Sequence, residues 1–236
     1  MRRQFEDGEP ELMDRAGASP AHLERALASL RGLNRYFGSY RIVEHFLRRW
    51  VKPGDRLRVL DLATGSADIP RVIADYARRV GAKVQIEAVD FQPATIETAR
   101  QLNAAYPEIV CTCSDVLTFS AREPFDLVIC SLALHHFNED DAVRLLRLCR
   151  ELSRTFVLVS DLRRGLLASA GVHLLTTFIF RDRMTRQDAR TSARRAFSFR
   201  EFEALAFRGG WRNFGSTRFR FARQAIWLEP GAERWA

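Results

Sequence analysis

Short apolar runs alternate with amphipathic segments along the middle of the chain, and this alternation limits the fold more than any other feature. Near-continuous apolar strands separated by helices are typical of a parallel sheet covered on both faces. The predicted strands cover residues 56–62, 83–90, 108–115, 125–134 and 155–162, and the predicted helices cover residues 68–80, 94–106 and 140–152. Two closing strands, at 211–219 and 223–230, predict an antiparallel hairpin. We expect a doubly wound, mostly parallel α/β sheet of seven strands.

Two segments depart from this alternation. Residues 1–20 are polar and contain Gly and Pro, whereas residues 21–50 carry apolar side chains at helical spacing. This spacing predicts two N-terminal helices that are separated near Gly38. Residues 162–208 form the second departure, a helical stretch rich in Arg and aromatic residues.

Polar residues stand at the ends of the first four predicted strands. They are Asp61, Asp90, Asp115 and Ser131. In open α/β sheets, ligands bind at the carboxyl ends of the strands, so we expect these side chains to surround one crevice. Asp61 or Asp115 could instead cap a helix or a turn.

The residue types at these ends suit the parts of an adenosine. Asp90 can accept hydrogen bonds from both ribose hydroxyls, because a carboxylate has two oxygens at the required separation. Phe91 offers a flat face to adenine. The carboxylate of Asp115 can accept from an exocyclic amino group, while the amide of Val116 donates to a ring nitrogen.

The loop VLDLATGSADIP, residues 59–70, indicates which nucleotide is bound. A dinucleotide fold holds its pyrophosphate on a glycine-rich loop, whereas this loop has Ala63 and Ala67 around the single Gly65. We expect Gly65 alone to provide the tight turn. Asp61 and Asp68 would repel a diphosphate, and they favour a ligand with a cationic end, such as S-adenosylmethionine (SAM).

Four segments resemble, in order and spacing, the cofactor motifs of class I SAM-dependent methyltransferases: VLDLATGSADIP, EAVDFQP, CSDVLTF and FDLVICSLALHHF. The chain departs from the family's usual D-x-G-x-G-x-G pattern at Ala63 and Ala67. LNRYFGSYRIVEHFLRRW, ahead of the first motif, is similar to the N-terminal helical segment of the quinone-biosynthesis methyltransferases. The resemblance covers about residues 55–160, and it implies the Rossmann-like methyltransferase fold, SAM as cofactor and S-adenosylhomocysteine as product.

The same resemblance assigns cofactor-binding residues and domains. Asp61, Ala63 and Gly65 would line the methionine end, Asp90 and Phe91 the ribose and adenine, Asp115 and Val116 the adenine edge, and Ser131 the sulfonium side. Residues 1–50 would form an N-terminal arm and helical lid. Residues 51–236 would form the SAM-binding domain, with a substrate-pocket insertion at about 162–208.

Two histidines are candidates for a catalytic base. A phenol, enol or hydroquinone acceptor becomes more nucleophilic when a base removes its proton, and histidine suits this task at neutral pH. His135 follows the fourth strand, beside the expected methyl position, and His173 lies in the 162–208 segment. His135 could instead cap a turn or pack. We expect no catalytic metal, because the adjacent His135 and His136 lack a suitable constellation of carboxylates.

Charge and composition limit the kinds of partner that we expect the chain to bind. The net charge is +8, but the arginines are spread along the chain and form no stripe, so nucleic acid is not the expected partner. The longest apolar region, residues 166–180, is too short and too polar to span a bilayer. We expect free thiols at the four cysteines, because their spacing is not that of a metal site. They are Cys111, Cys113, Cys130 and Cys149. We expect a cytoplasmic protein.

These observations predict a SAM-dependent methyltransferase that acts on a small aromatic, phenolic or quinone-like acceptor. Two alternatives remain open. A nucleic-acid methyltransferase would usually carry an Asn/Asp-Pro-Pro-aromatic stretch where this chain has Ser131 to Leu134. A non-catalytic SAM-binding regulatory module is favoured only by the altered loop. The sequence leaves the choice of O- or C-methylation and the oligomeric state undecided.

Overall fold

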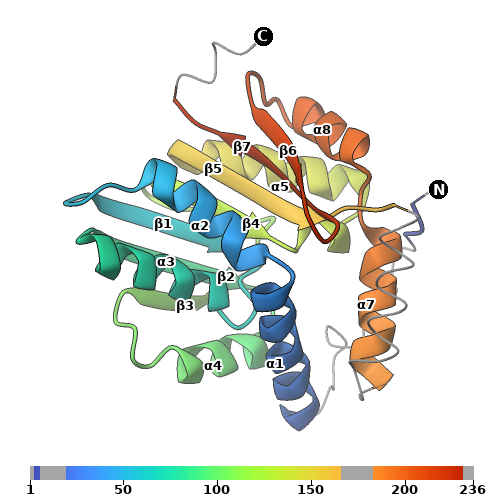
Figure 1. The fold of residues 1–236 in the computed structure, drawn as a ribbon, viewed down its shortest axis with the longest axis horizontal. Helices are drawn as coiled ribbons and strands as arrows, with labels where there is room; N and C mark the ends of the chain where they lie inside the picture. The colour runs from blue at the N-terminus through green and yellow to red at the C-terminus, as the bar shows by residue number, and fades with distance from the viewer. Residues whose placement is uncertain (1–2, 6–19, 166–182, 231–236) are drawn as a thin grey trace.

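The computed structural model describes residues 3–5, 20–165 and 183–230, and these form a sheet flanked by helices (Figure 1). The strands are β1 (Arg56–Leu62), β2 (Lys83–Asp90), β3 (Ile109–Cys113), β4 (Phe125–Ser131), β5 (Ser153–Leu162), β6 (Gly215–Phe219) and β7 (Arg223–Leu228). The helices are α1 (Pro20–Tyr36), α2 (Ser39–Trp50), α3 (Asp68–Val80), α4 (Pro93–Leu102), α5 (Glu139–Glu151), α7 (Arg183–Arg195) and α8 (Phe199–Arg208), with a 3-10 turn η2 (Leu134–His136).

Within the described residues, the sheet has seven strands in the order β3-β2-β1-β4-β5-β7-β6. The first five strands are parallel, and β7 pairs antiparallel with both β5 and β6. The predicted doubly wound sheet with an antiparallel C-terminal hairpin is therefore confirmed. The strand order reverses between β1 and β4, which makes the carboxyl ends of these strands the expected place for a ligand.

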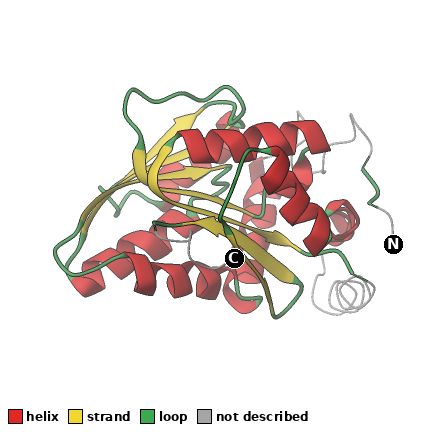
Figure 2. Cartoon of the chain, turned by 90° about the horizontal axis from the view of Figure 1, so that it is seen from above, coloured by secondary structure: helices red, strands yellow, loops and turns green. Residues whose placement is uncertain are grey.

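Helices cover both faces of the sheet (Figure 2). On one face, α2 and α3 bury a cluster that includes Phe46, Trp50 and Ile73 against β1, β2 and β5. On the other face, α5 and α8 bury a cluster that includes Phe202 and Trp211. Strands that are covered on both faces need apolar side chains in both directions, which explains the near-continuous apolar runs of the sequence.

The sequence also specifies where α3 starts and stops. Asp68 stands in the first turn of α3, and Arg78 and Arg79 stand in the last. Each charge therefore interacts favourably with the helix dipole. Gly81 follows with φ 77°, a left-handed conformation that ends a helix at little steric cost. α3 spans the same residues, 68–80, that the periodicity predicts.

The N-terminal helices are separated where the sequence predicts. Gly38, with φ 92°, lies between the end of α1 and the start of α2. α2 packs on α3, while α1 contacts α4 and α7 (Figure 1). The division into a lid over residues 1–50 and a binding domain over 51–236 stays a prediction.

Several predicted elements differ in their bounds from the structure. The strands expected over 108–115 and 211–219 are the shorter β3 and β6. The fourth strand was expected to run to residue 134, but β4 ends at Ser131, because Leu132 adopts a φ of 56° that no strand tolerates. The chain then forms η2. The helix expected over 94–106 ends at Leu102. Of the expected insertion at 162–208, residues 166–182 lie outside the described part of the chain.

Candidate functional site

Residues 61–68, the loop between β1 and α3, are named here the cofactor loop. Ala63, Gly65 and Ala67 all have left-handed backbone conformations, with φ angles of 57°, 56° and 54°. The expectation that Gly65 alone provides the turn is therefore wrong. An alanine in this conformation costs about 1–2 kcal/mol. The loop thus keeps the backbone of a glycine-rich turn although two of its glycine positions hold alanine.

Asp61 lies at the end of β1 with a fully buried carboxyl group. Only 2% of the residue is exposed, and the Thr64 hydroxyl donates a hydrogen bond of 2.5 Å to its Oδ2. Burial raises the pKa of Asp61 from 3.8 to about 8; the Thr64 hydrogen bond opposes this rise, and the nearby Asp68 and Asp90 add to it. Both charged groups that act on Asp61 are negative, which is an environment suited to a cation.

Asp68, at the other end of the cofactor loop, is held by the N-terminal helices. Asn34 of α1 donates from Nδ2 to Asp68 Oδ2 over 2.9 Å, and the Tyr40 hydroxyl of α2 donates to the same oxygen over 2.8 Å. Burial, and then the charge of Asp68, raise the pKa of Tyr40. Asn34 Oδ1 is a buried acceptor without a hydrogen-bond partner in the described protein.

Asp90, the last residue of β2, joins two loops at the sheet edge. Its Oδ2 accepts the amide of Gly65 over 2.9 Å, and its Oδ1 accepts the amide of Gln92 over 3.2 Å. Only 8% of Asp90 is exposed, whereas the neighbouring Phe91 is 56% exposed. A buried carboxylate therefore lies beside an exposed aromatic ring, the arrangement that we expect for a ribose and an adenine.

Asp115 lies two residues beyond the end of β3. Its side chain is exposed, and its Oδ1 accepts the amide of Leu117 over 2.9 Å. This is the turn-capping role that the sequence left open as an alternative. Val116 is buried in the core on the α5 and α8 face of the sheet. The structure brings Asp61 and Asp90 together, and Asp115 stands further along the same edge.

Ser131 is the last residue of β4. Its hydroxyl oxygen lies 3.0 Å from the hydroxyl oxygen of Ser160 on β5, so a hydrogen bond joins the two strands at their carboxyl ends. The two serines lie at the carboxyl ends of β4 and β5, which follow β1 and its cofactor loop in the order of the strands.

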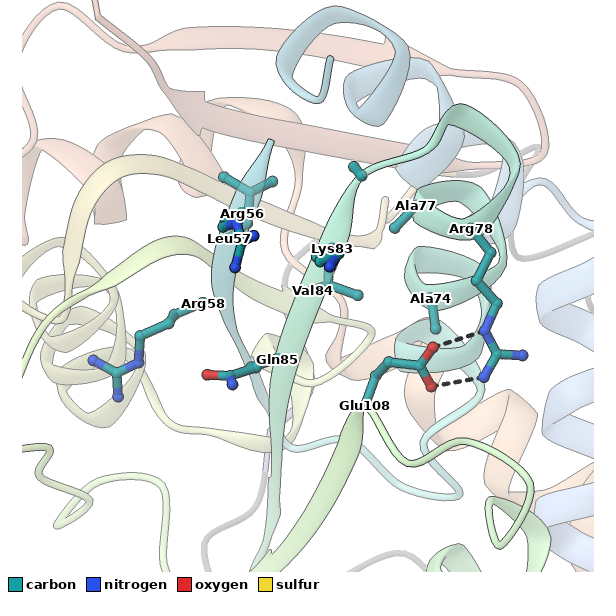
Figure 3. Close-up of a pocket in the computed structure, with 11 residues that line it drawn as sticks. Arg56, Leu57, Arg58, Ala74, Ala77, Arg78, Lys83, Val84, Gln85 and Glu108 are labelled. Atoms are coloured by element: carbon teal, nitrogen blue, oxygen red, sulfur yellow. Dashed lines mark hydrogen bonds and ion pairs between the residues drawn. The ribbon is translucent and has the colours of Figure 1, made fainter. Parts of the chain in front are cut away.

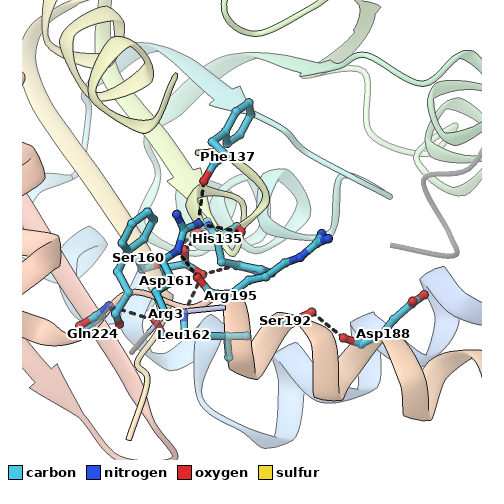
Figure 4. Close-up of polar contacts among 12 residues, drawn as sticks. Arg3, His135, Phe137, Ser160, Asp161, Leu162, Asp188, Ser192, Arg195 and Gln224 are labelled. Atoms are coloured by element: carbon cyan, nitrogen blue, oxygen red, sulfur yellow. Dashed lines mark hydrogen bonds and ion pairs between the residues drawn. The ribbon is translucent and has the colours of Figure 1, made fainter. Parts of the chain in front are cut away.

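His135, in η2, forms a buried pair with Asp161 of β5 (Figure 4). Nδ1 of His135 lies 2.6 Å from Asp161 Oδ1, and the His135 amide donates to Oδ2 over 2.8 Å. An ionised carboxylate accepts a hydrogen bond from Nδ1–H, which leaves Nε2 as the acceptor of the neutral ring. We call these two residues the His–Asp pair. Sequence reasoning missed Asp161, although it stands at a strand end like Asp61 and Asp90.

The hairpin supplies the surroundings of the His–Asp pair. Gln224 faces Asp161 across the β5–β7 pairing, and its Nε2 donates to the carbonyl oxygens of Leu162 and Phe197, each over 3.0 Å. Arg223 is almost fully buried; burial lowers the pKa of its guanidinium to about 10, while the charge of Asp161 opposes that shift. A buried cation thus compensates the buried carboxylate of the pair.

Arg3, near the start of the sequence, contacts the turn that carries His135. Its guanidinium donates to the carbonyl oxygens of His135 at 3.3 Å and Phe137 at 2.6 Å, and to that of Arg195 at 2.5 Å (Figure 4). The same group stacks 3.7 Å from the ring centroid of Phe197. Arg3 therefore links η2 to α7. His173, the second predicted base, lies outside the described residues.

A pocket of about 470 Å³ opens at the opposite edge of the sheet (Figure 3). It is lined by the first residues of β1 and β2 and by α3, and it includes the ion pair of Arg78 with Glu108. Ligands of open α/β sheets bind at the carboxyl ends of the strands, so this pocket is not the predicted site.

Comparison with known families and curated proteins finds similarity to methyltransferases over part of the chain. Residues 59–155 match the family model described as "Methyltransferase domain". A curated "2-phytyl-1,4-naphtoquinone methyltransferase" from Trichormus variabilis is 40% identical over 74 residues, which are 30% of this chain and 30% of that protein. The chain therefore matches this relative over less than a third of the relative's length.

Comparison with solved structures identifies the fold. Human N-acetylserotonin methyltransferase in complex with SAM aligns with a TM-score of 0.66 and 17% identity, over 90% of this chain and 57% of that one. The plantazolicin methyltransferase BpumL in complex with SAH aligns with a TM-score of 0.63 and 12% identity, over 87% and 90% of the two chains. Both alignments show the class I methyltransferase fold. In the described ranges, no helix has the length and apolar character needed to cross a bilayer.

Proposed function

We propose that this chain, which carries a class I SAM-dependent methyltransferase domain, transfers a methyl group from SAM to a small phenolic or quinone-like acceptor. The observation that carries the proposal is the row of polar groups at one edge of the sheet. Asp90, the cofactor loop and the His–Asp pair follow one another along the carboxyl ends of β2, β1, β4 and β5. This order suits a cofactor at one end and a proton acceptor at the other.

The donor set around the cofactor loop fits the cationic end of SAM. Asp61, Asp68 and Asp90 are buried carboxylates, and the unpartnered acceptor Asn34 Oδ1 lies on the residue that binds Asp68. An ammonium group would satisfy such acceptors and would offset both the burial and the repulsion from Asp68 and Asp90 that raise the pKa of Asp61. We assign Asp61, Ala63 and Gly65 to the methionine end, and Ser131 to the sulfonium side.

The adenosine would extend along the next two strand ends. Asp90 would accept the ribose hydroxyls, because its carboxylate is held in place by two backbone amides. Phe91 offers its exposed ring to adenine. Asp115 and Val116 would contact the edge of the base, with the exposed carboxylate of Asp115 as acceptor.

SAM supplies a methyl group on a sulfonium, which is displaced in line by a nucleophilic atom of the acceptor. The protein aligns the acceptor and excludes water. Nε2 of His135 would take the hydroxyl proton of a phenol or hydroquinone, and Asp161, which holds Nδ1, would stabilise the imidazolium that forms. The His–Asp pair follows the logic by which a buried carboxylate orients a catalytic histidine.

A small acceptor is supported by the naphthoquinone named for the partial relative and by the spread of the basic side chains. The cytoplasmic location, the division into domains at residue 50 and the substrate role of the 162–208 segment belong to the same proposal. So does the role of His173 as an alternative base.

Isothermal titration tests the cofactor assignment. We expect wild-type protein to bind SAM, and Asp90→Ala to weaken binding by about 2–3 kcal/mol, because the ribose hydroxyls then lose a charged acceptor in a buried site. The matched control is Asp75→Ala, on the exposed side of α3, which should bind SAM like wild type. Equal affinity of Asp90→Ala and wild type would refute the ribose assignment, and no binding by wild type would refute the function.

A further inference from the structure

The turn between β6 and β7 holds an aromatic residue in a conformation that disfavours it. Phe221 and Ala222 have φ angles of 57° and 53°. Two successive residues with positive φ are typical of hairpin turns that favour Asn-Gly, because a Cβ atom is crowded there. Phe221 is in addition 52% exposed. Strain and exposure both lower the stability of the fold, so stability does not explain a phenylalanine at this position.

This turn lies at the same edge of the sheet as the His–Asp pair. Arg223, the first residue of β7, pairs with Leu162, the last residue of β5. The amide of Arg163 donates to the carbonyl oxygen of Ala222 over 2.7 Å. Phe221 therefore stands just beyond the carboxyl end of the strand that carries Asp161.

Phe221 contacts an aromatic residue of a second element. Phe37 lies between α1 and α2, and the two ring centroids are 5.7 Å apart with the planes at 90°. The helices on either side of Phe37 supply Asn34 and Tyr40, which bind Asp68 of the cofactor loop. The contact between Phe37 and Phe221 thus joins two parts of the structure. One is the α1–α2 pair, which binds Asp68 of the cofactor loop, and the other is the β6–β7 hairpin, which adjoins the His–Asp pair.

We propose that Phe37 and Phe221 form an aromatic closure over the methyl acceptor and select a flat aromatic ring as substrate. This inference rests on the proposed function, because an acceptor must lie between the methyl donor and the base, and the two rings belong to the elements that adjoin the cofactor loop and the strand of Asp161. Edge-to-face and offset contacts favour an aromatic guest over a saturated one of equal size. A single edge-to-face contact is weak enough to open when the acceptor enters.

Two diols of the same carbon skeleton test the selection. The probes are 1,4-dihydroxynaphthalene, kept reduced, and its saturated counterpart decahydronaphthalene-1,4-diol, each titrated into the full chain with S-adenosylhomocysteine present. Phe221→Leu and Phe37→Leu keep an apolar side chain and remove the ring. The matched control is Phe207→Leu, since Phe207 is also exposed and forms a similar contact with Phe214, 4.9 Å between centroids, ahead of β6.

We expect wild type to prefer the aromatic diol. Phe221→Leu and Phe37→Leu should each weaken its binding by about three- to tenfold, the factor that one lost ring contact produces, and should leave binding of the saturated diol unchanged. Phe207→Leu should bind both diols like wild type. Phe221→Gly should raise the thermal midpoint by relieving the backbone strain, yet bind the aromatic diol more weakly.

Other outcomes separate the closure from the function on which it rests. Unchanged affinity for the aromatic diol in both ring variants, or equal losses for the two diols, would overturn the closure alone. A wild type that binds S-adenosylhomocysteine but neither diol would overturn the acceptor class together with the closure. A wild type that does not bind S-adenosylhomocysteine would overturn the proposed function itself.

Discussion

Asp61 shows at the scale of one residue how burial makes a carboxyl group a weaker acid. Its pKa is raised to about 8 by burial and by two neighbouring carboxylates, so much of the ligand-free protein holds it protonated at neutral pH. A bound ammonium would favour the ionised form. If the cofactor binds as proposed, its binding and proton release from Asp61 are therefore linked.

Replacing Asp61 should change stability and affinity in opposite directions. Between about pH 4 and pH 8 the folded state binds more protons than the unfolded state, because the pKa of Asp61 is higher in the folded state. The contribution of Asp61 to the free energy of unfolding therefore falls as pH rises through that range. We expect Asp61→Asn to raise the free energy of unfolding by about 1–3 kcal/mol at pH 8, where the wild type must bury a charge, and to change it little near pH 4. Urea unfolding at both pH values measures this.

The same variant should bind SAM at least tenfold more weakly at pH 8, because the charge-assisted contact to the ammonium is lost. Titration in two buffers of different ionisation enthalpy should detect a proton released by wild type near pH 7, and none released by Asp61→Asn. A variant that gains no stability at pH 8 and keeps its affinity for SAM would contradict the assignment.

The His–Asp pair makes a prediction about turnover. With a phenolic acceptor, His135→Gln should lower kcat by about 10²–10⁴-fold, since proton removal is lost, while SAM affinity changes little. Asp161→Asn should lower kcat less, because His135 remains but no carboxylate orients its ring. His45→Gln, an exposed histidine of α2, is the control. Unchanged kcat in His135→Gln would exclude this residue as the base.

At the scale of elements, the hairpin β6–β7 depends on the absence of one side chain. Gly215 opens β6 opposite Trp227, and a Cβ added there would lie 2.1 Å from the Trp227 ring. The indole therefore packs directly on the backbone of the neighbouring strand. α1 offers the opposite case, since a Cβ on Gly32 meets nothing within 4 Å.

The same substitution should therefore have opposite effects in the two elements. Gly215→Ala should lower the free energy of unfolding by about 1–3 kcal/mol, the cost of overpacking a close contact. Gly32→Ala should raise it by about 0.5–1 kcal/mol, because alanine is the better helix former. Thermal and urea unfolding of both variants provide the measurement. A Gly215→Ala protein as stable as wild type would show that the hairpin can shift away from the indole.

Residues of the N-terminal elements contact site residues that are far from them in the sequence. Tyr40 binds Asp68 across 28 positions, and Arg3 binds the carbonyl of His135 across 132 positions. Periodicity places Tyr40 on a helix, but it does not tell which strand end that helix meets. Contacts of this kind depend on how the helices cross the sheet, so they could not be predicted from local patterns.

For the molecule as a whole, the fold follows from its patterns more directly than the site does. Strand–helix alternation predicts the sheet, and the rule that ligands meet strand ends selects Asp61 and Asp90, which the structure brings together. The same rule applied to residues 155–162 would have found Asp161. The conformation of the cofactor loop was harder to predict, because alanine rarely adopts the left-handed backbone that Ala63 and Ala67 have.

The position of β7 has a consequence for how the protein is made. β7 follows β6 in the chain but lies between β6 and β5, so a ribosome releases β6 before the strand with which it pairs. At about 5–20 residues per second, β6 waits on the order of a second for its neighbour. During that interval β5 lacks its antiparallel neighbour, and Asp161 lacks Arg223 and Gln224. The surroundings of the His–Asp pair are thus completed only when the last strand of the described chain is in place.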